Sequence, residues 1–226
     1  MKFIYLLIAV ELTIAACSSV QAPASSKPST FFDNPVCQPP CWENVTPGVT
    51  TTDVAMTVFA KLADRTGISD LPSPYKAYVS EITFSPSPGD YAVFAETLDG
   101  KIMTMEFLQE QAYGVNLKHA IELFGKPQNV IVSLGTESVY DDADFYNPTH
   151  GVALSADYIP RAASGLVAIG PNTWLYAIEF FDPNHYDSYL DARYNGFADK
   201  EKELMQPWRG YGSYQEYYSP PTLQSP

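Results

Sequence analysis

The sequence has few of the residues from which catalytic and metal sites are commonly built. It contains three histidines and three cysteines in 226 residues, and neither a Gly-x-Ser-x-Gly nor a His-Glu-x-x-His motif. Gly-rich phosphate loops are also missing. A nucleophile beside a base, a zinc protease site and a nucleotide loop are therefore not indicated. We predict no catalytic residue, no metal ion and no cofactor.

Basic residues are scarce as well. Thirteen Lys and Arg stand against 26 Asp and Glu, which gives a formal net charge of −13. A protein that binds nucleic acid needs a basic face to neutralise the phosphates. We therefore expect no nucleic acid partner.

Long hydrophobic runs are absent. The N-terminal apolar stretch follows Lys2, ends at Ala16 and is interrupted by Glu11, whereas a transmembrane helix needs about 20 apolar residues. A basic residue, a short apolar stretch and small residues before a cysteine are typical of a secretory signal. An ordinary signal peptide followed by a chance cysteine is the alternative.

The segment Ile14-Ala15-Ala16-Cys17 resembles the lipobox of bacterial lipoproteins. This resemblance implies a signal peptide over residues 1–16, lipid on Cys17 and a location in the cell envelope outside the cytoplasm, at the outer membrane if there are two membranes. Two or three acyl chains anchor a protein durably. Residues 17–35 are expected to form the lipid anchor and a flexible tether, because Ser, Pro, Ala and Gln bury little apolar surface.

Two further cysteines, Cys37 and Cys41, are separated by Gln-Pro-Pro. In an exported protein such a pair can close a small disulfide loop. The redox-active motif has two intervening residues rather than three, so a structural disulfide is favoured over a redox role. No second pair of Cys or His follows at the spacing of zinc ligands.

Residues 36–110 are predicted to form a first α+β module. A run of threonines before an apolar periodic segment predicts a capped helix from about residue 53 that ends at Gly67. Strands are predicted over 78–84, 91–98 and 101–108. The last two flank Asp99-Gly100, which is a strong hairpin signal.

Residues 111–218 are predicted to form a second α+β module with an aromatic C-terminal segment, followed by a disordered tail over 219–226. Asn116 can cap a short helix that Gly125 ends. The remaining predicted elements are strands over 129–134, 151–158 and 174–181 and a helix over 184–195. The fold class is thus α+β, with antiparallel sheets each packed by a helix.

The two modules open alike, with Gly48-Val49-Thr50 and Gly114-Val115-Asn116 standing 66 residues apart before a helix and strands. This spacing favours a tandem α-β-β-β duplication. The alternative is two unrelated helices in one α+β domain.

Two segments resemble known families. Gly114 to Pro127 is similar to the glycine–helix–Gly-x-Pro signature of outer-membrane assembly lipoproteins of the SmpA/BamE type. Pro40-Cys41-Trp42 followed by Thr46-Pro47-Gly48-Val49-Thr50 resembles a motif of uncharacterised bacterial lipoproteins. The first resemblance implies a non-catalytic scaffold or assembly role in the envelope.

Two clusters of polar residues are candidates for a catalytic or metal-binding site. His185 stands among Asp182, Asp187 and Asp191, which suits an oriented base or a metal site but also a capped helix start. The latter is favoured. Three carboxylates lie within residues 141–144; a solvated acidic loop is favoured over a calcium site because the EF-hand spacing fails.

Aromatic residues are abundant, with 16 Tyr and 3 Trp. They concentrate near the C-terminus, where the candidate binding residues are Trp208, Tyr211, Tyr214 and Tyr217. Exposed Tyr and Trp are favoured at binding surfaces, although the same rings can instead complete the core. We expect a non-catalytic module that binds an envelope protein or a polysaccharide. The alternative is an envelope hydrolase that acts on glycan or peptide with carboxylates of the acidic loops.

Overall fold

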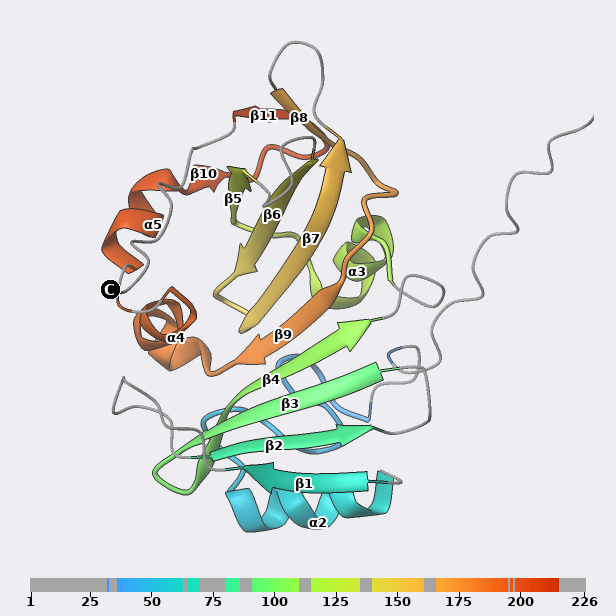
Figure 1. The fold of residues 1–226 in the computed structure, drawn as a ribbon, viewed down its shortest axis with the longest axis vertical. Helices are drawn as coiled ribbons and strands as arrows, with labels where there is room; N and C mark the ends of the chain where they lie inside the picture. Colours follow the sequence, from blue (N-terminus) through green and yellow to red (C-terminus); the bar gives the residue numbers. More distant parts are fainter. Residues whose placement is uncertain are drawn as a thin grey trace, which may run out of the picture.

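The computed structural model describes residues 32, 36–62, 65–69, 80–85, 91–109, 115–134, 140–160, 166–194, 196 and 198–215 (Figure 1). The predicted signal peptide, Cys17, Tyr217 and the tail over 219–226 lie outside these residues. The described part has the predicted α+β architecture. None of its helices is long and apolar enough to cross a bilayer.

Helices and strands follow one another in a fixed order along the chain. They are α2 (Thr52–Leu62), β1 (Arg65–Ser69), β2 (Ser80–Ser85), β3 (Tyr91–Leu98), β4 (Lys101–Gln109), α3 (Leu117–Phe124), β5 (Asn129–Leu134), β6 (Tyr140–Asn147), β7 (Val152–Pro160), β8 (Leu166–Ile169), β9 (Ala177–Phe181), the 3₁₀ turn η1 (Pro183–His185), α4 (Tyr186–Arg193), α5 (Ala198–Leu204), β10 (Gln206–Pro207) and β11 (Gly212–Gln215).

One antiparallel sheet of nine strands runs through the described residues in the order β1-β2-β3-β4-β9-β7-β6-β5-β10, and β8 pairs with β11 in a second, two-stranded sheet. The expectation of a separate sheet for each module was therefore wrong. The two modules share one sheet because β4 and β9, the last long strand of each, pair with each other.

In the first half of the structure, helix α2 is followed by four strands, β1 to β4, rather than by the predicted three. The hairpin of β3 and β4 forms as predicted, with Asp99 (φ 50°) and Gly100 (φ 73°) both in the left-handed region that a type I′ turn requires. Gly67 does not end the helix. It lies inside β1, opposite Thr83 of β2, since a glycine is tolerated in a strand.

The second half repeats this order, with α3 followed by β5, β6, β7 and β9 (Figure 1). Asn116 caps α3 as predicted, because its side chain accepts a hydrogen bond of 2.9 Å from His119 N–H. The acidic stretch is not a loop. It lies in β6, where Ala143 and Phe145 are buried in the main core while Asp142 and Asp144 point to the opposite face.

The start of each helix is held in the same way. At the start of β4, Thr52 N–H donates to Gly100 O (2.9 Å) and Ile102 N–H donates to Thr50 O (3.0 Å). Before β9, Leu117 N–H donates to Thr173 O (2.8 Å) and Leu175 N–H donates to Val115 O (3.4 Å). In each half, backbone hydrogen bonds thus connect the residues at the start of the helix to the residues at the start of the last long strand.

Hydrophobic residues gather on both faces of the sheet. The main core is covered by α2 and α3, which bury Phe59 and Phe124. The opposite face carries a smaller cluster with Tyr189 and Leu190 of α4. The alternation along β9 separates them, because Phe180 belongs to the main core and Phe181 to the smaller cluster.

One residue of the predicted tether over 17–35, Phe32, lies in the main core. Phe32 is 4% exposed and makes edge contacts with Phe107 (5.4 Å between ring centroids) and Phe124 (5.3 Å). One of these rings comes from β4 and the other from α3. Phe32 therefore packs against both halves of the sheet.

Candidate functional site

An open hollow of about 580 Å³ lies between α3 and the turn that follows β10. It is lined by Lys118, Ile121, Glu122, Lys126, Trp208, Arg209, Gly210 and Tyr211. β10 places the turn by pairing with β5, and Trp208 N–H donates to Gln128 O (2.9 Å). Two predicted binding residues, Trp208 and Tyr211, thus meet the exposed side of α3. We call this the aromatic hollow.

The tryptophan of the hollow is held by a buried tyrosine. Tyr214 is 1% exposed, and its ring lies parallel to Trp208, with centroids 5.7 Å apart and planes 9° from parallel. The Tyr214 hydroxyl donates to Gly210 O (2.7 Å) and accepts from Arg209 N–H (2.9 Å). Its prediction as a contact residue was wrong, because β11 pairs with β8 and turns this side chain into the core. Tyr211, in contrast, is 44% exposed.

The charge of the hollow is opposite in sign to that of the whole chain. Lys118, Lys126 and Arg209 line it together with a single carboxylate, Glu122. Glu122 lies 4.0 Å from Lys118 Nζ, in an exposed pair that contributes little stability. Partial burial, followed by the Glu122 charge, raises the pKa of the Tyr211 hydroxyl.

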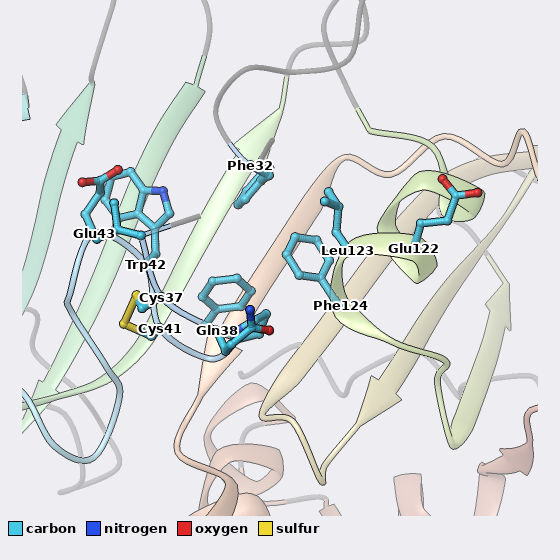
Figure 2. A pocket seen from close by; sticks show the side chains of 12 residues that line it. Phe32, Cys37, Gln38, Cys41, Trp42, Glu43, Glu122, Leu123 and Phe124 are labelled. Atoms are coloured by element: carbon cyan, nitrogen blue, oxygen red, sulfur yellow. A yellow bond between two sulfur atoms is a disulfide. The ribbon is translucent and has the colours of Figure 1, made fainter. Parts of the chain in front are cut away.

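A second hollow, of about 150 Å³, lies on the other side of α3 beside the disulfide (Figure 2). Its walls are mainly apolar and include Phe32, Trp42, Leu123 and Phe124, together with the disulfide. Glu43 and Glu122 stand at opposite sides of it in Figure 2.

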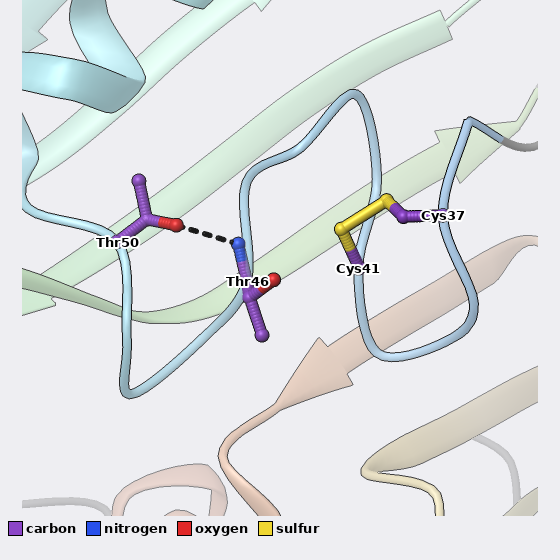
Figure 3. Close-up of a disulfide and its surroundings, with 4 residues drawn as sticks. All are labelled: Cys37, Cys41, Thr46 and Thr50. Atoms are coloured by element: carbon purple, nitrogen blue, oxygen red, sulfur yellow. Dashed lines mark hydrogen bonds between the residues drawn. A yellow bond between two sulfur atoms is a disulfide. The ribbon is translucent and has the colours of Figure 1, made fainter.

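The predicted disulfide between Cys37 and Cys41 is present, with Cα atoms 5.6 Å apart. It precedes Trp42, which contacts the rings of Phe107 (5.2 Å) and Phe59 (6.3 Å). Figure 3 shows the turn beyond it, in which Thr46 N–H donates to Thr50 Oγ1 (2.8 Å). The loop therefore carries a core residue, which agrees with a structural role.

His185 and Asp182 are in contact, with Nδ1 and Oδ2 2.6 Å apart. Asp182 also caps η1 by accepting from Asn184 N–H (2.9 Å), so the favoured interpretation as a capped helix start is consistent with the geometry. Burial opposes ionisation of Asp182, but the hydrogen bonds from His185 and Asn184 outweigh it and lower its pKa. Among the described residues, no group of three or more His, Cys, Asp and Glu is placed to hold a metal ion.

The carboxylates of β6 take part in a polar cluster that sequence reasoning missed. Arg193 of α4 donates to Asp144 Oδ1 (2.8 Å) through Nη2 and to Glu179 Oε2 (2.7 Å) through Nη1. Tyr189 also donates to Glu179 Oε2 (2.6 Å). The pKa of Glu179 is raised, because the effect of burial exceeds the opposing effect of the Arg193 charge. This cluster fixes α4 to the sheet.

Asp142, on the same face, has an altered acidity. Burial, and then the charges of Asp157, Asp144 and Asp141, raise its pKa to about 6. Burial also raises the pKa of Asp157. A carboxyl group with a pKa in this range can exchange protons near neutral pH.

No family model matches the sequence, and no curated protein matches it. A solved structure of a cysteine-rich secretory protein from Staphylococcus aureus is similar in part, at 10% sequence identity and a TM-score of 0.30. The matched region covers 66% of this chain and 51% of that chain. A likeness of this size carries no argument about fold or function.

Proposed function

We propose that the protein is a lipid-anchored, non-catalytic binding module that holds an envelope protein or a surface polymer on the outer side of a membrane. The observation that carries this proposal is the aromatic hollow, where Trp208 and Tyr211 stand over the basic side of α3. Rigid aromatic side chains lose little conformational entropy on binding. The stacking of Trp208 on the buried Tyr214 supplies this rigidity before any partner arrives.

The lipid anchor is proposed from the lipobox resemblance at Cys17. A tether over residues 18–31 reaches roughly 40 Å if its 14 residues are extended. The chain then enters the body at Phe32, which packs against Phe124 of α3. The helix that borders the aromatic hollow is thus also the helix that Phe32 packs against at the end of the tether.

We also propose that the two halves descend from a tandem duplication. Three pairs, each 65 residues apart, support it: Thr51 and Asn116 precede the helices, Ala55 and Ala120 are buried in them, and Phe59 and Phe124 are buried four residues further on. This spacing is one residue shorter than that between Gly48 and Gly114, so Asn116 corresponds to Thr51 rather than to Thr50. Strands β4 and β9 share the sequence Glu-Phe, at Glu106-Phe107 and Glu179-Phe180.

The pairing of these strands agrees with a local two-fold arrangement. Glu106 faces Glu179 directly across the pair, Met105 faces Phe180 and Phe107 faces Ile178. If Glu106 is equivalent to Glu179, then Met105 is equivalent to Ile178 and Phe107 to Phe180. Exchanging the two halves therefore converts the pair Met105–Phe180 into the pair Phe107–Ile178. Elements β8, β10 and β11, which hold the aromatic turn, follow only the second helix, so the binding site belongs to one copy.

The test is crosslinking in the native cells, followed by affinity capture of the full-length protein. We expect a defined set of envelope proteins or a surface polymer to be captured by the wild type, and the capture to be lost with Tyr211→Ala. Tyr158→Ala removes another tyrosine, 57% exposed and outside the aromatic hollow, and serves as the matched control. Cys17→Ala should move the protein from the membrane to the soluble fraction. Capture that Tyr211→Ala leaves unchanged would contradict the proposal.

An envelope hydrolase is the second candidate, and the acidity of Asp142 is the observation that favours it. A carboxyl group with a pKa of about 6 beside a second acidic group suits general acid–base catalysis. This candidate requires turnover of a glycan or peptide that Asp142→Asn reduces by about 100-fold or more. If Asp142→Asn retains the wild-type rate, or no turnover is found across envelope glycans and peptides, the hydrolase is excluded.

A further inference from the structure

We propose that the ligand of the aromatic hollow is an acidic glycan, a chain of sugar rings that carries carboxylate or phosphate groups. This inference rests on the proposed function and names the chemistry of the partner. Three features of the hollow carry it: flat rings, clustered cations and a fixed backbone.

The aromatic side chains suit the flat face of a sugar. The C–H groups on one face of a pyranose ring pack against an aromatic ring, and the hydroxyl groups around its edge remain free for hydrogen bonds. Tyr211 stands at 90° to Trp208, with centroids 5.9 Å apart, so the two rings form a corner rather than one flat patch. Such a corner can hold a sugar ring against one wall and cover its edge with the other.

The cations suit an acidic group on that sugar. Lys118 of α3 and Lys126, which follows the end of that helix, both line the hollow, and Arg209 approaches from the turn. Among the described residues, neither Lys126 nor Arg209 forms an ion pair, while Arg209 lies 5.2 Å from the centroid of Tyr214. A guanidinium in this position is oriented and can bind a carboxylate or phosphate through two hydrogen bonds.

The excess of basic residues in the hollow contrasts with the acidic character of the whole chain. The chain has a net charge of −13, and three of its 13 basic residues line one hollow with one acidic residue. A neutral glycan would gain no charge–charge attraction from these cations, and the net negative charge of the rest of the chain would repel an acidic glycan. A ligand with negative charges would therefore be guided to this hollow and away from other faces.

The fixed backbone lowers the cost of binding. The hydroxyl of Tyr214 joins Arg209 N–H and Gly210 O, so the turn that presents Trp208, Arg209 and Tyr211 is tied across its middle. Gly210 has φ 94°, a conformation that glycine adopts at no steric cost. The contact groups are thus in place before the ligand binds.

The experiment measures binding of the purified full-length protein, in detergent, to immobilised polymers at low ionic strength. The polymers are polygalacturonate (sugar with carboxylate), phosphomannan (sugar with phosphate), dextran (neutral sugar) and polyglutamate (carboxylate without sugar). We expect binding to polygalacturonate or phosphomannan that is at least about tenfold tighter than to dextran and polyglutamate. The stronger of the two identifies the acidic group. Added salt should weaken this binding.

Variants separate the rings from the charges. Tyr211→Ala and the double variant Lys118→Gln/Lys126→Gln should each weaken binding about tenfold or more, and Lys61→Gln, which removes an exposed lysine of α2, should leave it unchanged. Equal binding to dextran, equal binding to polyglutamate, or no binding to either acidic glycan would overturn the inference. If cells still yield a protein partner whose capture depends on Tyr211, the proposed function stands and only the glycan is wrong. If nothing captured depends on Tyr211, both fail.

Discussion

Tyr214 lies flat beneath Trp208, and its hydroxyl ties Arg209 N–H to Gly210 O. A tyrosine that looks from the sequence like a contact residue is therefore the support of the contact residues. The relationship separates two roles within one aromatic segment, because Tyr211 is exposed and Tyr214 is buried. Substitutions at the two positions should have different effects.

Tyr214→Phe keeps the ring but removes both hydrogen bonds of the hydroxyl. We expect the free energy of unfolding to fall by about 1 kcal/mol, because Arg209 N–H loses its acceptor and Gly210 O its donor in this partly buried turn. Partner capture should weaken as the turn loosens. Denaturant unfolding measures the first effect and crosslinking the second.

Tyr211→Phe is the matched control, since it removes the hydroxyl of an exposed tyrosine in the same turn. Its stability should stay within about 0.5 kcal/mol of the wild type. Equal stabilities of the two variants would mean that the Tyr214 hydroxyl does not hold the turn.

Gly48 is expected to be irreplaceable for two separate reasons. Its φ is 77°, and a Cβ at this position would lie 2.2 Å from Asp182 Oδ2. Asp182 cannot easily move away, since it is held by hydrogen bonds from His185 and Asn184. We expect Gly48→Ala to lower the free energy of unfolding by about 3 kcal/mol or more.

Gly100→Ala is the control for the backbone alone. Gly100 has a similar φ of 73°, but nothing lies within 4 Å of its Cβ position. Gly100→Ala should lower the free energy of unfolding by about 1 kcal/mol, because only the left-handed backbone conformation disfavours the alanine. If thermal and denaturant unfolding show the same loss for both variants, the contact between residue 48 and Asp182 has no energetic weight.

Local signals were enough to predict part of the fold. The turn at Asp99-Gly100 and the cap at Asn116 depend on a few adjacent residues, and the structure places both as predicted. Strand β6 was missed because its carboxylates suggested a solvated loop. Their partner, Arg193, lies about fifty residues further along the chain, so no local pattern reveals that the charge of Asp144 is balanced on the sheet.

The candidate site was predictable only in outline. Aromatic content pointed to residues 208–218, and Trp208 and Tyr211 do line a hollow. Its other wall, Lys118 of α3 and Lys126 just after that helix, lies more than eighty residues earlier in the chain. The burial of Tyr214 likewise depends on the pairing of β11 with β8. Contacts between such distant segments are set by topology, which neither periodicity nor composition encodes.

Arg193 is predicted to be one of the most sensitive polar positions. Its guanidinium bridges Asp144 and Glu179, and both carboxylates lie mostly inside the protein. Arg193→Met leaves these charges without their cation, so we expect a loss of about 3–5 kcal/mol at neutral pH. Arg193→Lys should recover only part of it, because an ammonium cannot reach both carboxylates with the same fork geometry.

Lys202→Gln is the comparison for Arg193, since it removes an ion pair with Asp187 at the surface (2.6 Å). Exposed pairs contribute about 0–1 kcal/mol. The loss in Arg193→Met should shrink as the pH is lowered, because Glu179, whose pKa is raised by burial, then takes up a proton. A loss that stays constant with pH would show that packing, rather than charge, is what Arg193 supplies.

Asp142 should make the protein less stable as the pH rises. Its pKa is about 6 in the folded state and about 3.9 in an unfolded chain. Below pH 4 both states hold the proton, so Asp142 has no effect there. Between pH 4 and pH 6 the unfolded state loses its proton first, and the free energy of unfolding falls with rising pH. Because the side chain is only partly buried, solvent screening limits the loss to about 1 kcal/mol.

Asp142→Asn should remove most of this decline, so the variant gains stability relative to the wild type at pH 7 but not at pH 4. The lowered pKa of Asp182 acts in the opposite sense and at lower pH, so the two effects separate along the pH axis. Asp99→Asn replaces an exposed carboxylate in a turn that accepts either residue and is the control. Chemical denaturation at pH 4, 5, 6 and 7 measures the slope, and an Asp142→Asn slope equal to that of Asp99→Asn would mean that Asp142 is not the titrating group.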